Sequence, residues 1–242
     1  MDLRIANSRQ HLGEIAAREI GSELRRCLGC QHKVRMVFAA APSQSEMLEH
    51  LIREPDLDWT RVTAFHMDEY LGLAPGSPQL FHEWLRRTIF ERLPFGAVYA
   101  MEPGADPGRA CVDYSALLGE APLDLCLSGI GVNGHLAFND PPADLSDPKT
   151  VKVVTLDPVC RQQQVDDGCF ARLEDVPTQA MTLSLPMLMS AERIFCCVPG
   201  QQKAAAVRSM IHDPISGLMP ATVLRRHPRC TVYLDPESAA LL

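Results

Sequence analysis

Residues 123–141 read LDLCLSGIGVNGHLAFNDP, an apolar run that leads into a glycine-rich loop with polar side chains. Continuous apolar runs of this length are typical of strands that are buried on both faces of a parallel sheet. Similar runs alternate with helical patterns along the chain, at residues 34–40, 62–66, 97–101, 151–156, 194–198 and 231–234. The alternation predicts an α/β, Rossmann-like fold: a doubly wound, mostly parallel sheet of about seven strands with helices on both faces.

The chain shows no internal boundary that would separate two cores. Apolar residues between Leu12 and Cys27 recur at helical spacing, and Gly29 supplies a stop, so a helix opens the fold. The 242 residues contain no internal repeat and no long linker rich in Pro, Gly or Ser. We therefore expect a single domain over residues 1–242.

Composition excludes several classes of function. The formal charge of −7 gives no basic surface for phosphate backbones, so a nucleic-acid partner is not expected. No stretch reaches the roughly 18 consecutive apolar residues of a membrane span, and the first ten residues lack an export signal. The nine cysteines are an odd number and several sit in apolar runs, as expected for core thiols in a reducing compartment. These features predict a cytoplasmic protein without a membrane or metal partner.

Candidate ligand-binding segments are those that directly follow the strands, because ligands of open parallel sheets lie at the carboxyl ends. Residues 39–44 combine small side chains such as Ala40 with the hydroxyl of Ser43 before a helix, which suits an anion, although Ser43 could simply cap that helix. Asp68 and Glu69 follow the next strand, where charge is costly unless it is used or paired. A helix cap or a loop salt bridge is the alternative interpretation of these two acids.

The glycine-rich loop holds a candidate acid/base group. Gly129 and its neighbouring glycines allow a ligand close to the backbone, while Asn133, His135 and Asp140 supply polar atoms. A histidine held by a carboxylate has a defined tautomer and a stabilised protonated form, as acid/base chemistry requires. The alternative is a buried structural histidine. A dinucleotide site is disfavoured, because no ribose-binding acid follows at the expected distance.

Lys203 follows another predicted strand, in the stretch PGQQKA (199–204). A cation in the first turn of a helix opposes the helix dipole, so its presence indicates an anionic ligand there. The alternative is a solvated lysine on a surface helix.

Three of these segments together resemble the glucosamine-6-phosphate deaminase/isomerase family, which is related to the 6-phosphogluconolactonases. They are MDEYLGL (67–73), GIGVNGHLAFNDP (129–141) and GQQKA (200–204). The resemblance implies that Asp68 moves a proton from C2 to C1 of the open-chain amino sugar, and that His135, with Asp140 and Asn133, opens the ring. It also places a group of substrate-binding residues around the sugar phosphate: Ala40, Ser43, Glu69, Gly129, Arg161 and Lys203.

The resemblance implies a small-molecule sugar phosphate as the partner, and neither a metal nor an organic cofactor. The activity implied is isomerisation with deamination of a 2-amino-2-deoxyhexose 6-phosphate, of glucosamine or of galactosamine. A 6-phosphogluconolactonase-like hydrolase and a non-catalytic sugar-phosphate-binding protein are the alternatives, and a homo-oligomer is compatible with the family. The chain departs from some members by Asn133 and Asp140, where they carry Asp and Glu. An expected phosphate-binding arginine falls near RQQQ (161–164), at a position that holds a glutamine, and Arg161 is the candidate substitute. Allosteric activation is not supported.

Overall fold

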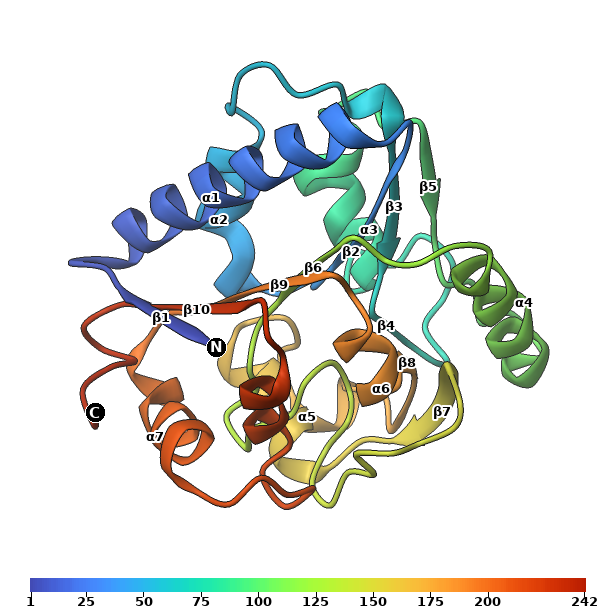
Figure 1. Cartoon of the computed structure of the whole chain (residues 1–242). Coiled ribbons are helices and arrows are strands. Elements are labelled where there is room, and N and C mark those ends of the chain that lie inside the picture. The colour runs from blue at the N-terminus through green and yellow to red at the C-terminus, as the bar shows by residue number, and fades with distance from the viewer.

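The computed structural model describes residues 1–242, and a seven-stranded parallel sheet forms its centre (Figure 1). The strand order is β1-β10-β9-β6-β2-β3-β5, and every neighbouring pair is parallel. The strands are β1 (Asp2–Ile5), β2 (Val34–Phe38), β3 (Val62–His66), β5 (Ala97–Tyr99), β6 (Leu125–Ser128), β9 (Arg193–Val198) and β10 (Cys230–Leu234). The predicted α/β class is confirmed.

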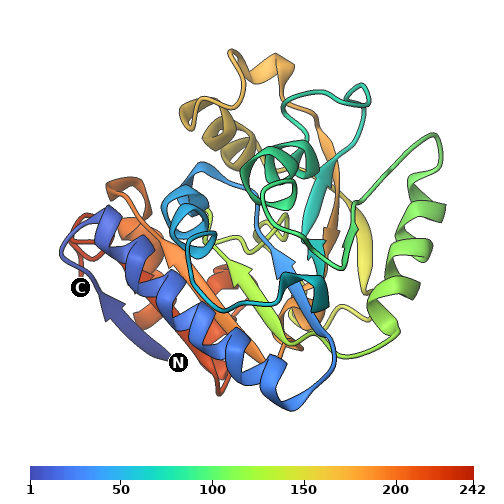
Figure 2. The same cartoon turned by 90° about the horizontal axis from the view of Figure 1, so that it is seen from above.

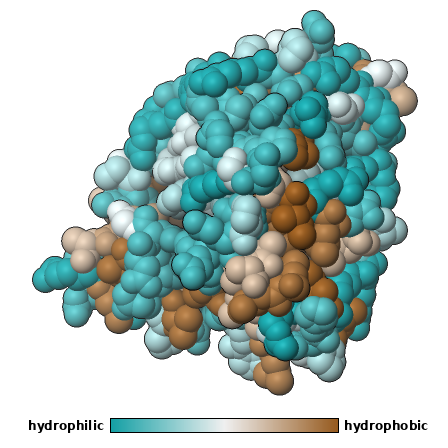
Figure 3. Space-filling view, turned by 90° about the vertical axis from the view of Figure 1, so that its left-hand side faces the viewer, coloured by the Kyte–Doolittle hydropathy of each residue, from teal (hydrophilic) through white to brown (hydrophobic).

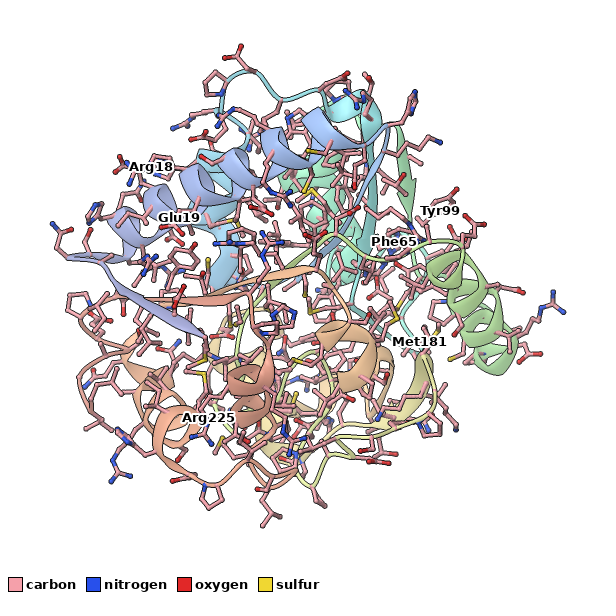
Figure 4. All side chains as sticks on the ribbon, in the orientation of Figure 1. Arg18, Glu19, Phe65, Tyr99, Met181 and Arg225 are labelled. Carbon is pink, nitrogen blue, oxygen red and sulfur yellow. The ribbon has the colours of Figure 1, made fainter.

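The central strands are apolar throughout because both of their faces are covered. In β2 the side chains of Met36 and Phe38 enter one hydrophobic core, while Val37 between them enters the other. Strand β3 behaves in the same way, and its Phe65 stacks on Tyr99 of β5 with ring centroids 5.3 Å apart (Figure 4). This two-sided burial is the physical origin of the continuous apolar runs in the sequence.

Helices cover both faces of the sheet (Figures 1 and 2). Above it in Figure 1 lie α1 (Arg9–Cys30), α2 (Ser45–Leu51) and α3 (Phe81–Leu85), and below it α6 (Leu185–Met189) and α7 (Ala204–His212). The remaining helices are α4 (Pro107–Gly119) and α5 (Pro158–Asp166). Helix α1 is capped by Ser8, and it crosses α2 at Gly13, where a Cβ atom would lie only 2.7 Å from the backbone of Glu46.

A second, antiparallel sheet of three strands packs beside the first. Its order is β4 (Asp68–Tyr70), β8 (Gln179–Leu183) and β7 (Val151–Thr155). The prediction that residues 151–156 belong to the main sheet is wrong, because they form β7, whose exposure alternates along the strand. The sequence patterns missed β4 and β8, which are too short or too polar at one end to stand out.

The edge strand β1 takes the seventh place in the main sheet. All four of its residues are exposed, so it has no apolar run from which a strand could be predicted. Figure 3 views the side of the molecule that lies at the left in Figure 1, and shows hydrophilic side chains over its upper half and hydrophobic ones gathered below. No helix of the structure has both the length and the apolar character that crossing a bilayer requires.

The two sheets meet at Met67, between the end of β3 and the start of β4. The amide of Met67 donates to the carbonyl of Phe38, 3.3 Å away, and its carbonyl accepts from the amide of Leu183 at 2.8 Å. These bonds hold the chain at the carboxyl ends of β2 and β3. Asp68, the next residue, is thereby fixed at the edge where ligands of parallel sheets bind.

Candidate active site

A cleft opens at the carboxyl ends of β2, β3, β6 and β9. Six of the residues singled out from the sequence line it: Ala40, Ser43, Asp68, Gly129, His135 and Lys203. Asn133 and Asp140 lie behind His135 and hold it. The structure therefore brings together segments that are more than 150 residues apart in the chain, and it leaves Glu69 and Arg161 outside the cleft.

Asp68 presents a buried carboxylate to this cleft. The residue is 7% exposed, and no protein group donates a hydrogen bond to its side-chain oxygens. Burial, helped by the negative charge of Glu69, raises the pKa of Asp68 well above its usual range. A buried carboxylate that receives no hydrogen bond from the protein has a strong tendency to take a proton, which is the property of a general base.

Glu69 has a structural role, which corrects its assignment as a substrate-binding residue. Its side chain is fully buried, and Oε1 accepts hydrogen bonds from the amides of Tyr70 and Phe81, each at 2.9 Å. Oε2 accepts from the amide of His82 at 3.0 Å and contacts its Nδ1 at the same distance. Successive side chains of a strand point to opposite faces, so Glu69 points away from the side that Asp68 faces. It holds the start of α3, as a helix cap does.

His135 lies in a hydrogen-bonded loop with Asn133 and Asp140. Its Nδ1 is 3.1 Å from Asp140 Oδ1, an ion-pair distance, although the two atoms do not have hydrogen-bond geometry. Asn133 joins both partners, because its Nδ2 donates to Asp140 Oδ1 at 3.0 Å and its Oδ1 accepts from the amide of His135 at 3.1 Å. The other oxygen of Asp140 accepts from the amide of Asp157 at 3.0 Å.

This network keeps Asp140 charged. Burial raises the pKa of Asp140, but His135, the Asn133 amide and the Asp157 N–H outweigh it and hold the pKa below its ordinary value. An ionised Asp140 beside Nδ1 holds the imidazole in one orientation. The arrangement gives an oriented histidine at the cleft.

The loop glycines serve the packing of this histidine. A Cβ atom on Gly131 would lie 2.2 Å from Cε1 of His135, so only glycine leaves room for the imidazole ring. Gly134 has φ of +82°, and a Cβ atom there would lie 2.0 Å from Sδ of Met219. Close approach and a left-handed turn explain these two glycines without any dinucleotide.

Lys203 is buried in the wall of the cleft and does not lie on the protein surface. It is only 3% exposed, which contradicts the interpretation as a solvated lysine, and no carboxylate lies within salt-bridge distance of it. Burial lowers the pKa of Lys203 to about 8, an effect that the charge of Asp167 only partly offsets. A buried cation without an anionic partner favours an anionic ligand in the cleft.

Ser43 also faces the cleft and caps no helix. The residue at the N-cap of α2 is Gln44, and no side chain accepts a capping hydrogen bond there. Ser43 Oγ accepts a hydrogen bond from Gln44 Nε2 at 3.0 Å. Gln44 Oε1 is buried and has no hydrogen-bond partner in the protein. This segment therefore offers the hydroxyl of Ser43 to the cleft, and the side chain of Gln44 contacts that hydroxyl.

Arg161 does not reach the cleft, which corrects the second assignment. Its Nη2 donates to the carbonyls of Leu173 at 2.7 Å and Val176 at 2.8 Å, so it ties α5 to the following loop. Helical geometry turns Gln163 and Gln164 to the cleft instead. Gln163 Oε1 accepts from the amide of Val132 at 2.9 Å, whereas the Gln164 side chain makes no hydrogen bond. Both glutamines belong to the RQQQ run of the sequence. Only the orientation of α5 determines that they face the cleft while Arg161 faces the following loop.

Comparison with known proteins gives consistent similarities. The family model described as glucosamine-6-phosphate isomerases/6-phosphogluconolactonase matches residues 7–233. A glucosamine-6-phosphate deaminase of Listeria welshimeri is 35% identical over 211 residues, 87% of this chain and 88% of that protein. One of Exiguobacterium sibiricum is 38% identical over 191 residues, 78% of this chain and 74% of the other.

Solved structures extend these similarities to the fold. A monomeric glucosamine-6-phosphate deaminase superposes over the full length of both chains, with a TM-score of 0.91 and 28% identity. The 6-phosphogluconolactonase of Thermotoga maritima superposes over 97% of this chain and 98% of its own, with a TM-score of 0.77 and 17% identity, which supports a common fold.

Proposed function

The chain belongs to the family of glucosamine-6-phosphate isomerases and 6-phosphogluconolactonases, and we propose that its cleft converts glucosamine 6-phosphate and water into fructose 6-phosphate and ammonia. The observation that carries the proposal is the unpaired, buried carboxylate of Asp68 in the same cleft as His135 and Lys203. The curated relatives at 35% and 38% identity bear the name of this deaminase.

Ring opening is the step that suits His135. With Nδ1 turned to Asp140, the Nε2 side of the imidazole is left for the substrate. A protonated imidazole donates to the ring oxygen of the cyclic sugar while the C1 hydroxyl loses its proton, and the open-chain aldehyde results. The ionised Asp140 supports this step because it fixes the orientation of the imidazole toward the substrate.

Isomerisation is the step that suits Asp68. Its carboxylate takes the proton from C2 of the aldehyde, which gives an enolamine, and returns a proton to C1. The C2 imine that forms is hydrolysed by water, so that ammonia leaves and the ketose remains. The raised pKa of Asp68 matches this exchange, since the same group must accept and release one proton near neutral pH.

The phosphate belongs at Lys203 and Ser43. Lys203 supplies a cation without a competing carboxylate within salt-bridge distance, and Ser43 supplies a hydroxyl beside backbone amides. A substrate anion would replace the solvation that Lys203 loses on burial. No step of this scheme calls for a group other than these side chains and water. We retain a cytoplasmic location and a homo-oligomer as predictions that belong to this proposal.

A comparison of three substrates tests the proposal. We expect ammonia release from glucosamine 6-phosphate to exceed that from galactosamine 6-phosphate, and 6-phosphogluconolactone to be hydrolysed no faster than in buffer. Faster lactone hydrolysis without ammonia release would establish the lactonase activity instead. Binding of all three without turnover would establish a sugar-phosphate-binding protein.

The first prediction concerns Asp68→Asn. The amide cannot take the C2 proton, so exchange of that proton with deuterated solvent should fall by roughly 10²–10⁴ or more, while substrate binding persists. Stability should not decrease, because burial penalises the charge that the variant lacks. The measurement is the appearance of deuterium at C2 by NMR. Exchange at the unaltered rate in a folded variant would refute the role of Asp68.

A further inference from the structure

Cys160 lies close to the proposed ring-opening pair, although no step of the proposed reaction uses it. Its Sγ, a ring nitrogen of His135 and a carboxylate oxygen of Asp140 all lie within 4.8 Å of one another. The thiol comes from α5 and the other two groups come from the glycine-rich loop. All three groups belong to the types that bind transition-metal ions.

The separations approach those of a tetrahedral metal site. Zn²⁺ lies about 2.0–2.2 Å from nitrogen and oxygen ligands and about 2.3 Å from sulfur. Ligand atoms around one ion are therefore about 3.3–3.8 Å apart, and His135 Nδ1 is already 3.1 Å from Asp140 Oδ1. A shift of the Cys160 side chain by an ångström or so, on the order of a rotamer adjustment, would close the set.

A second observation points to a ligand at the same place. His135 is 8% exposed, and its buried Nδ1 has no hydrogen-bond partner in the protein. Its nearest polar neighbour is Asp140 Oδ1, 3.1 Å away but not in hydrogen-bond geometry. In the tautomer that carries its proton on Nε2, Nδ1 can donate its lone pair to an ion held between the two residues.

We propose that Cys160, His135 and Asp140 form a binding site for Zn²⁺ or a similar thiophilic divalent ion, which blocks the acid/base role of His135 when it is occupied. The ligand set of one sulfur, one nitrogen and one oxygen suits Zn²⁺, Cd²⁺ and Co²⁺ and excludes Mg²⁺ and Ca²⁺, which take oxygen ligands. Three protein ligands leave a fourth coordination position for water.

Binding exchanges a proton for the ion. The Sγ–H bond of Cys160 breaks, an Sγ–metal bond forms, and the proton leaves through the cleft to solvent. Occupation removes the His135–Asp140 pair from acid/base chemistry.

Metal binding to the full chain can be measured without any turnover. Addition of CdCl₂ should produce the thiolate-to-Cd²⁺ charge-transfer absorption, and calorimetry with ZnCl₂ should show one strong site. Cys160→Ser should weaken ZnCl₂ binding by about tenfold or more, because even indirect partners of a metal site contribute 10–100-fold. The matched controls are Cys30→Ser, an exposed thiol, and Cys169→Ser, a half-buried thiol outside the cluster.

The outcomes decide between this site and the other thiols. Loss of binding in Cys160→Ser with normal binding in both controls supports the proposal. Normal binding in a folded Cys160→Ser chain, or no ZnCl₂ binding below millimolar concentration, overturns it. Anomalous diffraction from wild-type crystals soaked in ZnCl₂ decides the case if Cys160→Ser fails to fold, since the peak must lie among the three ligand atoms.

Inhibition of ammonia release by ZnCl₂ is the one readout that rests on the proposed function. Cys160→Ser should raise the inhibitory ZnCl₂ concentration by the same factor as its binding constant. An unaltered inhibitory concentration would overturn the blocking role. Absence of ammonia release from the wild-type chain would refute the deaminase proposal and leave the binding measurements valid.

Discussion

Asp68 and Glu69 are neighbours in the sequence but have opposite environments in the structure. Asp68 is buried at the cleft without a hydrogen-bond donor, whereas Glu69 accepts hydrogen bonds from three backbone amides. The first arrangement raises the pKa of Asp68, whereas the second pairs the oxygens of Glu69 with backbone N–H groups. Residue type alone does not distinguish the two acids. They differ because successive side chains of the three-residue strand β4 point to opposite faces.

His135→Gln tests ring opening separately from isomerisation. The variant should lose roughly 10²–10⁴ of the rate on the cyclic sugar, the range for a positioned acid/base group. A substrate generated in its open-chain form should escape most of that loss, because the step that needs the imidazole is already complete. Stopped-flow measurement with both forms checks this, with Asp140→Asn as a milder companion. Equal losses for both forms would place His135 in the isomerisation step.

Lys203 predicts a pH dependence of substrate binding. Its pKa of about 8 means that the lysine loses its charge as the pH rises through that value. Affinity for the phosphate should therefore be full below pH 8 and fall above it, while the phosphate itself is fully ionised across this range. We expect Lys203→Met to weaken binding by about 1.5–3 kcal/mol and to flatten KM between pH 7 and 9. A KM profile in the variant that still rises through pH 8 would assign the titration to another group.

Helix α3 shows how an element can be held by a residue that looks catalytic. Its first amides point at Glu69, and its N-cap residue Leu80 offers no side-chain acceptor of its own. Helix α5 similarly depends on Arg161, which binds carbonyls of the loop that follows it. In both elements the charged side chain binds backbone groups of the neighbouring segment and so holds the helix to it.

Glu69→Gln should weaken α3 and leave the chemical steps intact. The amide oxygen can still accept from Tyr70 and Phe81, but the amide nitrogen cannot accept from His82 and leaves that N–H unpaired. We expect a loss of about 1–3 kcal/mol in unfolding free energy, the cost of a buried unsatisfied group. Urea unfolding measures the loss. The fall in kcat should be far smaller than in Asp68→Asn, since Glu69 touches no reacting atom and its charge is the lesser cause, after burial, of the raised pKa of Asp68. A fall in kcat to the level of Asp68→Asn would restore Glu69 to the catalytic machinery.

At the scale of the whole molecule, polar contacts join the N-terminal helix to the last strand. On α1, Glu19 accepts a hydrogen bond from Tyr233 of β10 at 2.7 Å (Figure 4 labels Glu19). One turn further, Glu23 binds Arg26 at 2.8 Å and Arg229 at 2.7 Å. These contacts close the chain by fixing its first helix against residues more than 200 positions away.

Glu23→Gln should destabilise the fold in a pH-dependent way. Burial raises the pKa of Glu23, but Arg26 and Arg229 outweigh it and hold the pKa below the usual value. The stabilisation is therefore present above the unfolded pKa of about 4.5 and is lost as the pH falls through the lower folded value. We expect a loss of about 1 kcal/mol at pH 7, since the arginines are partly exposed, and less at pH 3. Thermal unfolding at both values measures this, and a loss that is independent of pH would exclude the ion pairs as its cause.

The local pattern of the sequence was sufficient for the α/β class, the first helix, most central strands and the segments that form the cleft. Each of these depends on burial or on residue type within a few positions, as in the run at 62–66 that became β3. The second sheet, the edge strand β1 and the separate roles of Asp68 and Glu69 were decided only by tertiary structure. Tertiary structure also decided that Gln163 and Gln164 line the cleft in place of Arg161. It likewise brought Cys160 close to His135 and Asp140. These features depend on the direction in which a side chain leaves its element and on the neighbours it meets there, and contacts between distant segments determine both.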